Sequence, residues 1–199
     1  ESHFNNWFGV VFFIVLYSLV LLFVPFYRKM DKKPKGTYLA FVVAFAIEMH
    51  GIPFSMWLIS WMIGKSLPEG VLWGHTLVLS IGHAGMHIGI ALTLIALFLI
   101  LNGWYNIYRK YWSKEKGKGA LVTTGIYRYI RHPQYTGLLL ISLGMILNWA
   151  TLPMLILFPV MIFMYVRLAK KEEQDMLKEF GDEYLDYMNK TKRFIPYVV

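Results

Sequence analysis

The chain has 199 residues, of which 57% are hydrophobic and only 16% are charged. Soluble domains usually carry about 25% charged residues, and here the deficit reflects long apolar stretches separated by short charged ones, as in membrane proteins. The net charge of +8 does not indicate nucleic-acid binding, because the Lys and Arg residues lie between apolar runs. The absence of cysteine excludes disulfides, thiolate metal sites and a cysteine nucleophile.

The first three expected membrane spans cover residues 7–26, 37–63 and 71–101. About twenty helical residues rise about 30 Å, which is the thickness of the hydrocarbon core. The first run does not resemble a secretory signal, since no basic region precedes it and no small-residue cleavage site follows it. In the second run, Pro53 predicts a kink.

Residues 135–168 are too long for one span, because they would rise about 51 Å as a single helix. Turn and helix-start residues interrupt the run between Asn148 and Pro153. We therefore expect a helical hairpin with arms at residues 135–149 and 153–168, followed by a charged, amphipathic tail.

Together these elements predict an all-α fold: a polytopic transmembrane bundle of about five spans, with a C-terminal helical hairpin and an amphipathic cytoplasmic tail helix. Residues 1–199 are expected to form a single integral membrane domain. Residues 7–101 supply three spans, and residues 102–199 supply a polar loop, the hairpin and the tail. The predicted localisation is a multi-pass membrane protein with its N-terminus outside.

A polar, aromatic stretch lies directly before the hairpin and contains the first candidate site. Pro133 lacks an N–H and suits the first turn of a helix, which leaves backbone N–H groups near Gln134 and Tyr135 to bind an anion. Arg131 and His132 add donors. The alternative interpretation is an interfacial loop with a basic anchor.

The second candidate element is the acidic pair Glu172 and Glu173, just past the hairpin. An acidic pair beside a membrane helix is usually a solvated face. Farther on, Phe180, Tyr184 and Tyr187 recur at helical spacing and predict one face of a surface helix that packs on the bundle or the bilayer.

In combination, these motifs resemble the C-terminal signature of isoprenylcysteine carboxyl methyltransferases, and phospholipid methyltransferases share a similar pattern. The order and spacing of the motifs are specific, whereas a lone Arg-His-Pro would be weak. The resemblance covers residues 121–196 and rests on Arg131-His132-Pro133-x-Tyr135-x-Gly137, then Glu172-Glu173, then Phe180-Gly181-x-x-Tyr184-x-x-Tyr187.

The resemblance implies a methyltransferase that binds S-adenosylmethionine on the cytoplasmic side and releases S-adenosylhomocysteine. A carboxylate would pair the cofactor's ammonium or ribose, and an aromatic ring could contact its sulfonium. The residues implied in cofactor binding are Tyr127, Arg131, His132, Pro133, Gln134, Tyr135, Gly137, Glu172 and Glu173. The residues implied in catalysis are Arg131, Glu173 and Arg167.

Four ionisable residues lie within the second and third expected spans: Glu48, His50, His83 and His87. Ionisable groups at that depth are costly and often mark function. Three interpretations stay open: a hydrogen-bonded pair that fixes helix packing beside small residues, part of the acceptor pocket, and a metal site, for which no further ligand is obvious. We assign these residues to the acceptor pocket and predict no metal.

The expected partners are membrane lipids and a lipophilic or lipidated acceptor, such as an isoprenylcysteine carboxylate, a lipid amine or a thiol. One competing function is an NADPH-dependent membrane reductase of the sterol reductase type, which the paired acids disfavour. Another is a non-enzymatic transporter or interaction module. No Gly-rich strand–helix loop is present, which excludes a Rossmann-type cofactor site.

Charge patterning gives a testable topology. Basic loops follow the first and third expected spans, so the positive-inside rule places these loops in the cytoplasm and the N-terminus outside. Acidic and basic residues nearly balance in the tail, so its cytoplasmic side follows from the hairpin and from the resemblance and not from charge. Reporters fused at Lys116 and at Val199 should both report the cytoplasmic side. Reporters on opposite sides of the membrane would contradict the hairpin.

Overall fold

The computed structural model describes residues 7–22, 52–64, 84–112, 119–149 and 152–197. All regular elements in these segments are helices, so the predicted all-α class is confirmed for this part of the chain. In chain order they are α1 (Trp7–Ser18), η2 (Leu19–Leu22), α4 (Ile52–Ile63), α6 (Ala84–Ile107), η4 (Tyr108–Trp112), η5 (Gly125–Arg128), α7 (Pro133–Trp149), α8 (Leu152–Phe180) and α9 (Asp182–Lys190).

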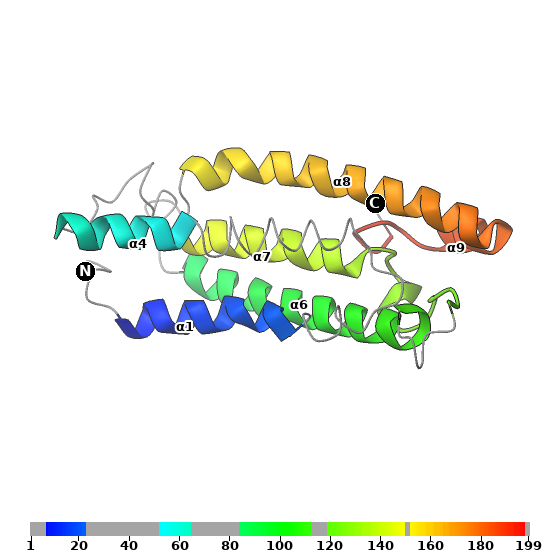
Figure 1. Ribbon diagram of the computed structural model, residues 1–199, viewed down its shortest axis with the longest axis horizontal. Helices are drawn as coiled ribbons and strands as arrows, with labels where there is room; N and C mark the ends of the chain where they lie inside the picture. The colour runs from blue at the N-terminus through cyan, green and yellow to red at the C-terminus, as the bar shows by residue number, and fades with distance from the viewer. Residues whose placement is uncertain (1–6, 23–51, 65–83, 113–118, 150–151, 198–199) are drawn as a thin grey trace.

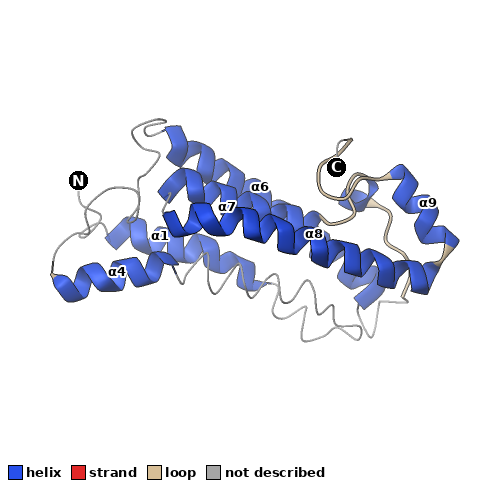
Figure 2. Cartoon of the chain, turned by 90° about the horizontal axis from the view of Figure 1, so that it is seen from above, coloured by secondary structure: helices blue, strands red, loops and turns tan. Residues whose placement is uncertain are grey.

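Three long helices, α6, α7 and α8, form the body of the molecule. They run alternately up and down, with α7 between α6 and α8 (Figure 1). The predicted helical hairpin corresponds to α7 and α8. The element α4 lies at one end of the molecule and α9 at the other, as both Figure 1 and Figure 2 show. The start of α7 and the end of α8 therefore meet at the end that carries α9.

Small residues allow the backbones of α6 and α7 to approach closely. A Cβ atom on Gly89 would lie 2.6 Å from the carbonyl oxygen of Gly144, and one on Gly144 would lie 2.8 Å from the Gly89 carbonyl oxygen. Farther along, a Cβ on Gly137 would overlap Ile100. This glycine seam, made of Gly89, Gly144 and Gly137, is the kind of interface that holds helices together in membranes.

The helix α6 continues beyond the predicted end of the third span at residue 101. Asn102 and Asn106 lie one turn apart inside it, and the amide of Asn106 donates to the carbonyl oxygen and the side chain of Asn102, both at 2.9 Å. These two polar residues follow the predicted end of the span, but they do not end the helix, because their amides bond to one another within it.

The helix α8 is also longer than the predicted arm at residues 153–168. Its 29 residues rise about 44 Å, and they carry the acidic pair on the same helix as the apolar arm. No glycine or proline lies between Leu168 and Phe180 to interrupt it. Gly181 then ends the helix with a φ of 53°, a conformation that favours glycine.

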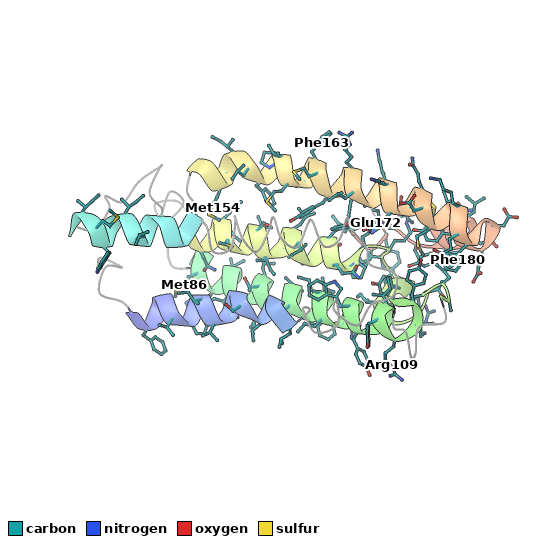
Figure 3. The ribbon with its side chains drawn as sticks, viewed as in Figure 1. Met86, Arg109, Met154, Phe163, Glu172 and Phe180 are labelled. Carbon is teal, nitrogen blue, oxygen red and sulfur yellow. The ribbon has the colours of Figure 1, made fainter. Side chains whose placement is uncertain are left out.

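The outer faces of the long helices expose large apolar side chains. Phe98 on α6 is 63% exposed and Phe163 on α8 is 65% exposed, and Phe163 points away from α7 (Figure 3). Among the described residues, one helical stretch, Ala84–Tyr111, is long and apolar enough to cross a membrane. The count of five spans stays a prediction, and the kink expected at Pro53 depends on residues outside the described segments.

The glycine seam gives the first structural prediction. Gly89→Ala should lower the stability of the protein by about 1–3 kcal/mol, because the added methyl meets backbone atoms of α7 that cannot move aside alone. Thermal unfolding in detergent measures this. The control is Ala91→Leu, a larger addition at an exposed position of the same helix, which should leave stability nearly unchanged. Equal melting of Gly89→Ala and the parent would contradict the close packing.

Candidate functional site

The C-terminal segment, residues 191–197, lies along the chain that leads into α7. Ile130 and Lys192 form a parallel bridge. The N–H of Arg131 donates to the carbonyl oxygen of Lys192 at 2.8 Å, and the N–H of His132 donates to that of Arg193 at 3.1 Å. These bonds satisfy the backbone donors just before the helix and fix the register between two segments that lie about sixty residues apart in the sequence.

The carboxylate of Glu173 is the centre of the polar cluster. Glu173 is 3% exposed and accepts hydrogen bonds from Arg131 Nε at 2.8 Å and from Arg193 Nη2 at 2.6 Å. The Nε2 atom of His132 lies 3.3 Å from the same carboxylate. We call Glu173, Arg131, His132 and Arg193 the Glu173 cluster. A buried carboxylate without such partners would be very costly.

The partners of Glu173 decide its protonation. Burial alone would raise the pKa of this carboxyl, but hydrogen bonds from His132, Arg193 and Arg131 outweigh burial and hold the pKa well below its usual range. Glu173 is therefore ionised at every pH at which the protein is normally handled.

Arg131 also connects the cluster to the last turn of α9 and to the residue that follows it. Its Nη1 atom donates to the carbonyl oxygen of Met188 at 3.1 Å and to that of Thr191. The Arg131 side chain is 8% exposed, and its Nε and Nη1 atoms donate to groups of the protein itself. Arg131 thus holds the start of α7, the acidic part of α8 and the C-terminal segment together.

Glu172 has a different environment from its neighbour. Its side chain is 25% exposed, against 4% for Glu173. The hydroxyl of Tyr135 donates to Glu172 at 2.9 Å, and His132 Nδ1 lies 3.7 Å from its other oxygen. Glu172 lies on the side of α8 that faces α7 (Figure 3). Of the two acids, Glu172 is the one that a bound molecule can reach.

Aromatic rings line the way from this cluster into the bundle. The rings of His132 and Tyr135 lie 5.5 Å apart, and Tyr135 stacks on Tyr165 of α8 with ring centroids 5.6 Å apart. On the other side, His132 lies 6.1 Å from Phe194 of the C-terminal segment. Because Tyr135 and Tyr165 are almost fully buried, this row joins the polar end to the hydrophobic core.

Tyr127 and Gln134 form a second polar group. The Gln134 amide donates to the Tyr127 hydroxyl, which donates to the Gly103 carbonyl oxygen at 3.2 Å. The Tyr187 hydroxyl of α9 donates to the Tyr127 carbonyl oxygen at 2.6 Å. Burial raises the pKa of the Tyr127 phenol, which therefore stays protonated. This group ties η5 to α6 and α9.

The structure thus brings together five of the residues selected from the sequence: Arg131, His132, Tyr135, Glu172 and Glu173. Other selected residues lie elsewhere. Pro133 begins α7 and packs against Gly103; Gly137 belongs to the glycine seam; Arg167 is exposed on α8, about 9 Å along the helix from Glu173.

The four ionisable residues of the second and third expected spans lie mostly outside the described segments, which do not include Glu48, His50 and His83. His87 is described and lies exposed on α6, in the half of that helix away from the Glu173 cluster (Figure 1). Within the described segments, no group of three His, Asp or Glu residues is arranged to hold a metal ion.

Sequence reasoning missed the C-terminal segment. Arg193 contributes two bonds from Nε, both at 3.1 Å, besides the one from Nη2, and Phe194 contributes its ring and its carbonyl oxygen, to which Thr136 donates at 2.9 Å. In the sequence, the only signal for this segment is a basic residue beside an aromatic one near the end of residues 121–196, the range of the family resemblance. No local pattern indicates that these two residues pair with the start of α7.

Comparison with known proteins agrees with the family resemblance seen in the sequence. The phospholipid methyltransferase family model matches residues 71–183. The protein-S-isoprenylcysteine O-methyltransferase of Schizosaccharomyces pombe is 32% identical over 87 residues, which are 43% of this chain and 37% of that protein. The human protein of the same name is 28% identical over 87 residues, or 43% of this chain and 31% of its own length.

A different activity is named for another relative. The methanethiol S-methyltransferase of Crocosphaera subtropica is 28% identical over 119 residues, which are 56% of this chain and 44% of that protein. In each of these three relatives, the match covers less than half of the relative's own length.

The Glu173 cluster gives a prediction about stability. Glu173→Gln removes the negative charge between two largely buried guanidinium groups and should lower stability by about 3 kcal/mol. Asp175→Asn is the matched control, because Asp175 lies on the same helix in an exposed ion pair with Lys178, and exposed pairs contribute about 0–1 kcal/mol. Thermal unfolding of both variants at neutral pH measures the difference.

The difference in stability between the parent and Glu173→Gln should depend on pH. A carboxyl whose pKa is lower in the folded state than in the unfolded state adds stability above its ordinary value of 4.5 and loses that stability as the pH falls toward the folded value. The gap in melting temperature between the parent and Glu173→Gln should therefore be constant from pH 7 to about 5 and narrow below 4.5. A gap that widens on acidification would contradict the assignment.

Proposed function

This chain belongs to the phospholipid methyltransferase family, and from that membership we propose that it is an integral membrane enzyme that transfers a methyl group from S-adenosylmethionine to a lipophilic acceptor. The observation that supports this most directly is the pairing of a reachable carboxylate, Glu172, with the aromatic residues His132 and Tyr135 at the start of α7.

The groups at this end of the molecule fit the chemistry of the proposed methyl donor. S-adenosylmethionine carries two cationic centres, a carboxylate, a ribose and an adenine. Glu172 would pair the ammonium or the ribose hydroxyls. The first-turn N–H groups of α7, at Gln134 and Tyr135, would face the carboxylate. The rings of Tyr135 and His132 would contact the remaining apolar and cationic parts.

The buried members of the cluster have a different proposed role. Glu173 and Arg131 are engaged with each other, with Arg193 and with backbone carbonyl groups. We therefore assign them to positioning, and the cofactor contact that the sequence suggested for either acid is assigned to Glu172. Arg167 has no contact among the described residues that supports a catalytic role.

When bound, the donor supplies an electrophilic methyl group for an in-line displacement. The chain's own residues need to align the two reactants and exclude water. A carboxylate or thiolate acceptor needs no proton removed by the enzyme, which agrees with a site built from binding groups. The row of rings from His132 to Tyr165 leads from the buried Glu173 cluster to the apolar interior.

The acceptor is proposed to be lipophilic and to enter from the bilayer. The exposed apolar faces of α6 and α8 and the membrane-length stretch at Ala84–Tyr111 support contact with lipid. The named relatives act on isoprenylcysteine or methanethiol, so a carboxylate or thiolate on an apolar body is the class to test first. The Glu173 cluster is proposed to face the cytoplasm.

The decisive experiment is cofactor binding by calorimetry in detergent. The parent protein should bind S-adenosylhomocysteine and should not bind NADPH. Glu172→Gln should weaken S-adenosylhomocysteine binding by about 10- to 150-fold, because one charge-assisted bond contributes about 1.5–3 kcal/mol. Its melting temperature should stay close to that of the parent, since glutamine still accepts the bond from Tyr135.

The control is Glu183→Gln, an exposed acid on α9, which should bind as the parent does. Tight NADPH binding with none for S-adenosylhomocysteine would overturn the proposed function. Parent-like binding by Glu172→Gln would overturn the assignment of that residue.

A further inference from the structure

We propose that Arg193 is a positioning residue that fixes the rotational setting of α8 and thereby the direction in which Glu172 is presented to the cofactor. The inference rests on the proposed function. It gives the C-terminal segment a part in cofactor binding even though none of its residues need touch the cofactor.

The first step is the forked ion pair that Arg193 makes with Glu173. The Nε atom lies 3.1 Å from each carboxylate oxygen and the Nη2 atom lies 2.6 Å from one of them. A forked contact of this kind fixes direction as well as distance. Arg131 contacts one carboxylate oxygen through Nε at 2.8 Å, so Arg193 is the partner that engages both oxygens.

The second step is that Arg193 is itself held in place. Its carbonyl oxygen accepts the N–H of His132 at 3.1 Å, and the flanking Lys192 and Phe194 carbonyl oxygens accept bonds from Arg131 and Thr136. Its side chain therefore extends from a segment in fixed register with the start of α7. Because Arg193 binds Glu173, the position of α8 is fixed relative to the C-terminal segment and to the start of α7.

The third step follows from helix geometry. Adjacent residues on an α-helix point about 100° apart, so holding Glu173 inward sets where Glu172 points. In the structure this setting places Glu172 beside Tyr135 and His132. Without Arg193, Glu173 keeps Arg131 and His132, which contact a single oxygen of its carboxylate. The direction of the carboxylate is then less closely fixed, and so is the place of Glu172.

The test is a double-mutant cycle read out by S-adenosylhomocysteine affinity and by melting temperature. Arg193→Gln is made in the parent and in the Glu172→Gln protein. If Arg193 acts through Glu172, Arg193→Gln should weaken binding about tenfold in the parent and less than about twofold in the Glu172→Gln background. Its effect on melting temperature should be the same in both backgrounds.

Two further variants complete the experiment. Arg193→Lys keeps the charge without the fork and should bind with intermediate affinity; it also serves if Arg193→Gln does not fold. Lys190→Gln removes an exposed charge close in sequence and should bind as the parent does.

The outcomes separate the inference from the proposed function. An equal loss of affinity in both backgrounds, or parent-like affinity for folded Arg193→Gln, would overturn the positioning role and leave the proposed function standing. Absence of S-adenosylhomocysteine binding by the parent would overturn both, and it would be seen before any variant is compared.

Discussion

The arrangement of the polar end depends on one buried carboxylate. Glu173 is carried by α8, and its partners come from two other segments: Arg131 and His132 just before α7, and Arg193 of the C-terminal segment. An ionised group in such a place is tolerated only if its partners are all in position. The need to satisfy this charge therefore selects one relative placement of three segments that are far apart in sequence.

The rest of the body is held by a different force. Along the glycine seam, the backbones of α6 and α7 come so close that a methyl group would collide with a carbonyl oxygen. Dispersion between closely packed backbones needs no charge and works equally well in lipid. The molecule thus combines an apolar contact along its length with an ionic one at its end, and neither can substitute for the other.

The sequence predicted the hairpin from local rules, and the family resemblance implied that the two motifs meet. Pro133 predicts where a helix starts, and the length of residues 135–168 requires a reversal. The sequence could not say which of Glu172 and Glu173 faces inward, since that depends on the rotation of α8 and hence on packing. The sequence also did not indicate that Gly137 packs against Ile100; the cofactor contact expected for Gly137 stays a prediction.

Longer-range features escaped prediction for the same reason. Arg193 meets Glu173 because the backbone of the C-terminal segment pairs with residues 130–132. Hydrophobic periodicity in the sequence does not indicate which residues of two such segments pair. The sequence predicts the ends of the membrane spans, and the helices α6 and α8 continue beyond those ends. Helices end at caps and breakers such as Gly181, and charged residues continue them readily.

The glycine seam also restricts how this molecule can move. Helices whose backbones touch cannot slide or roll past one another without first separating, because closely packed interfaces do not deform continuously. The helices α6 and α7 therefore behave as one rigid body. A ligand that reaches the row of rings between α7 and α8 must therefore displace α8, the C-terminal segment or both.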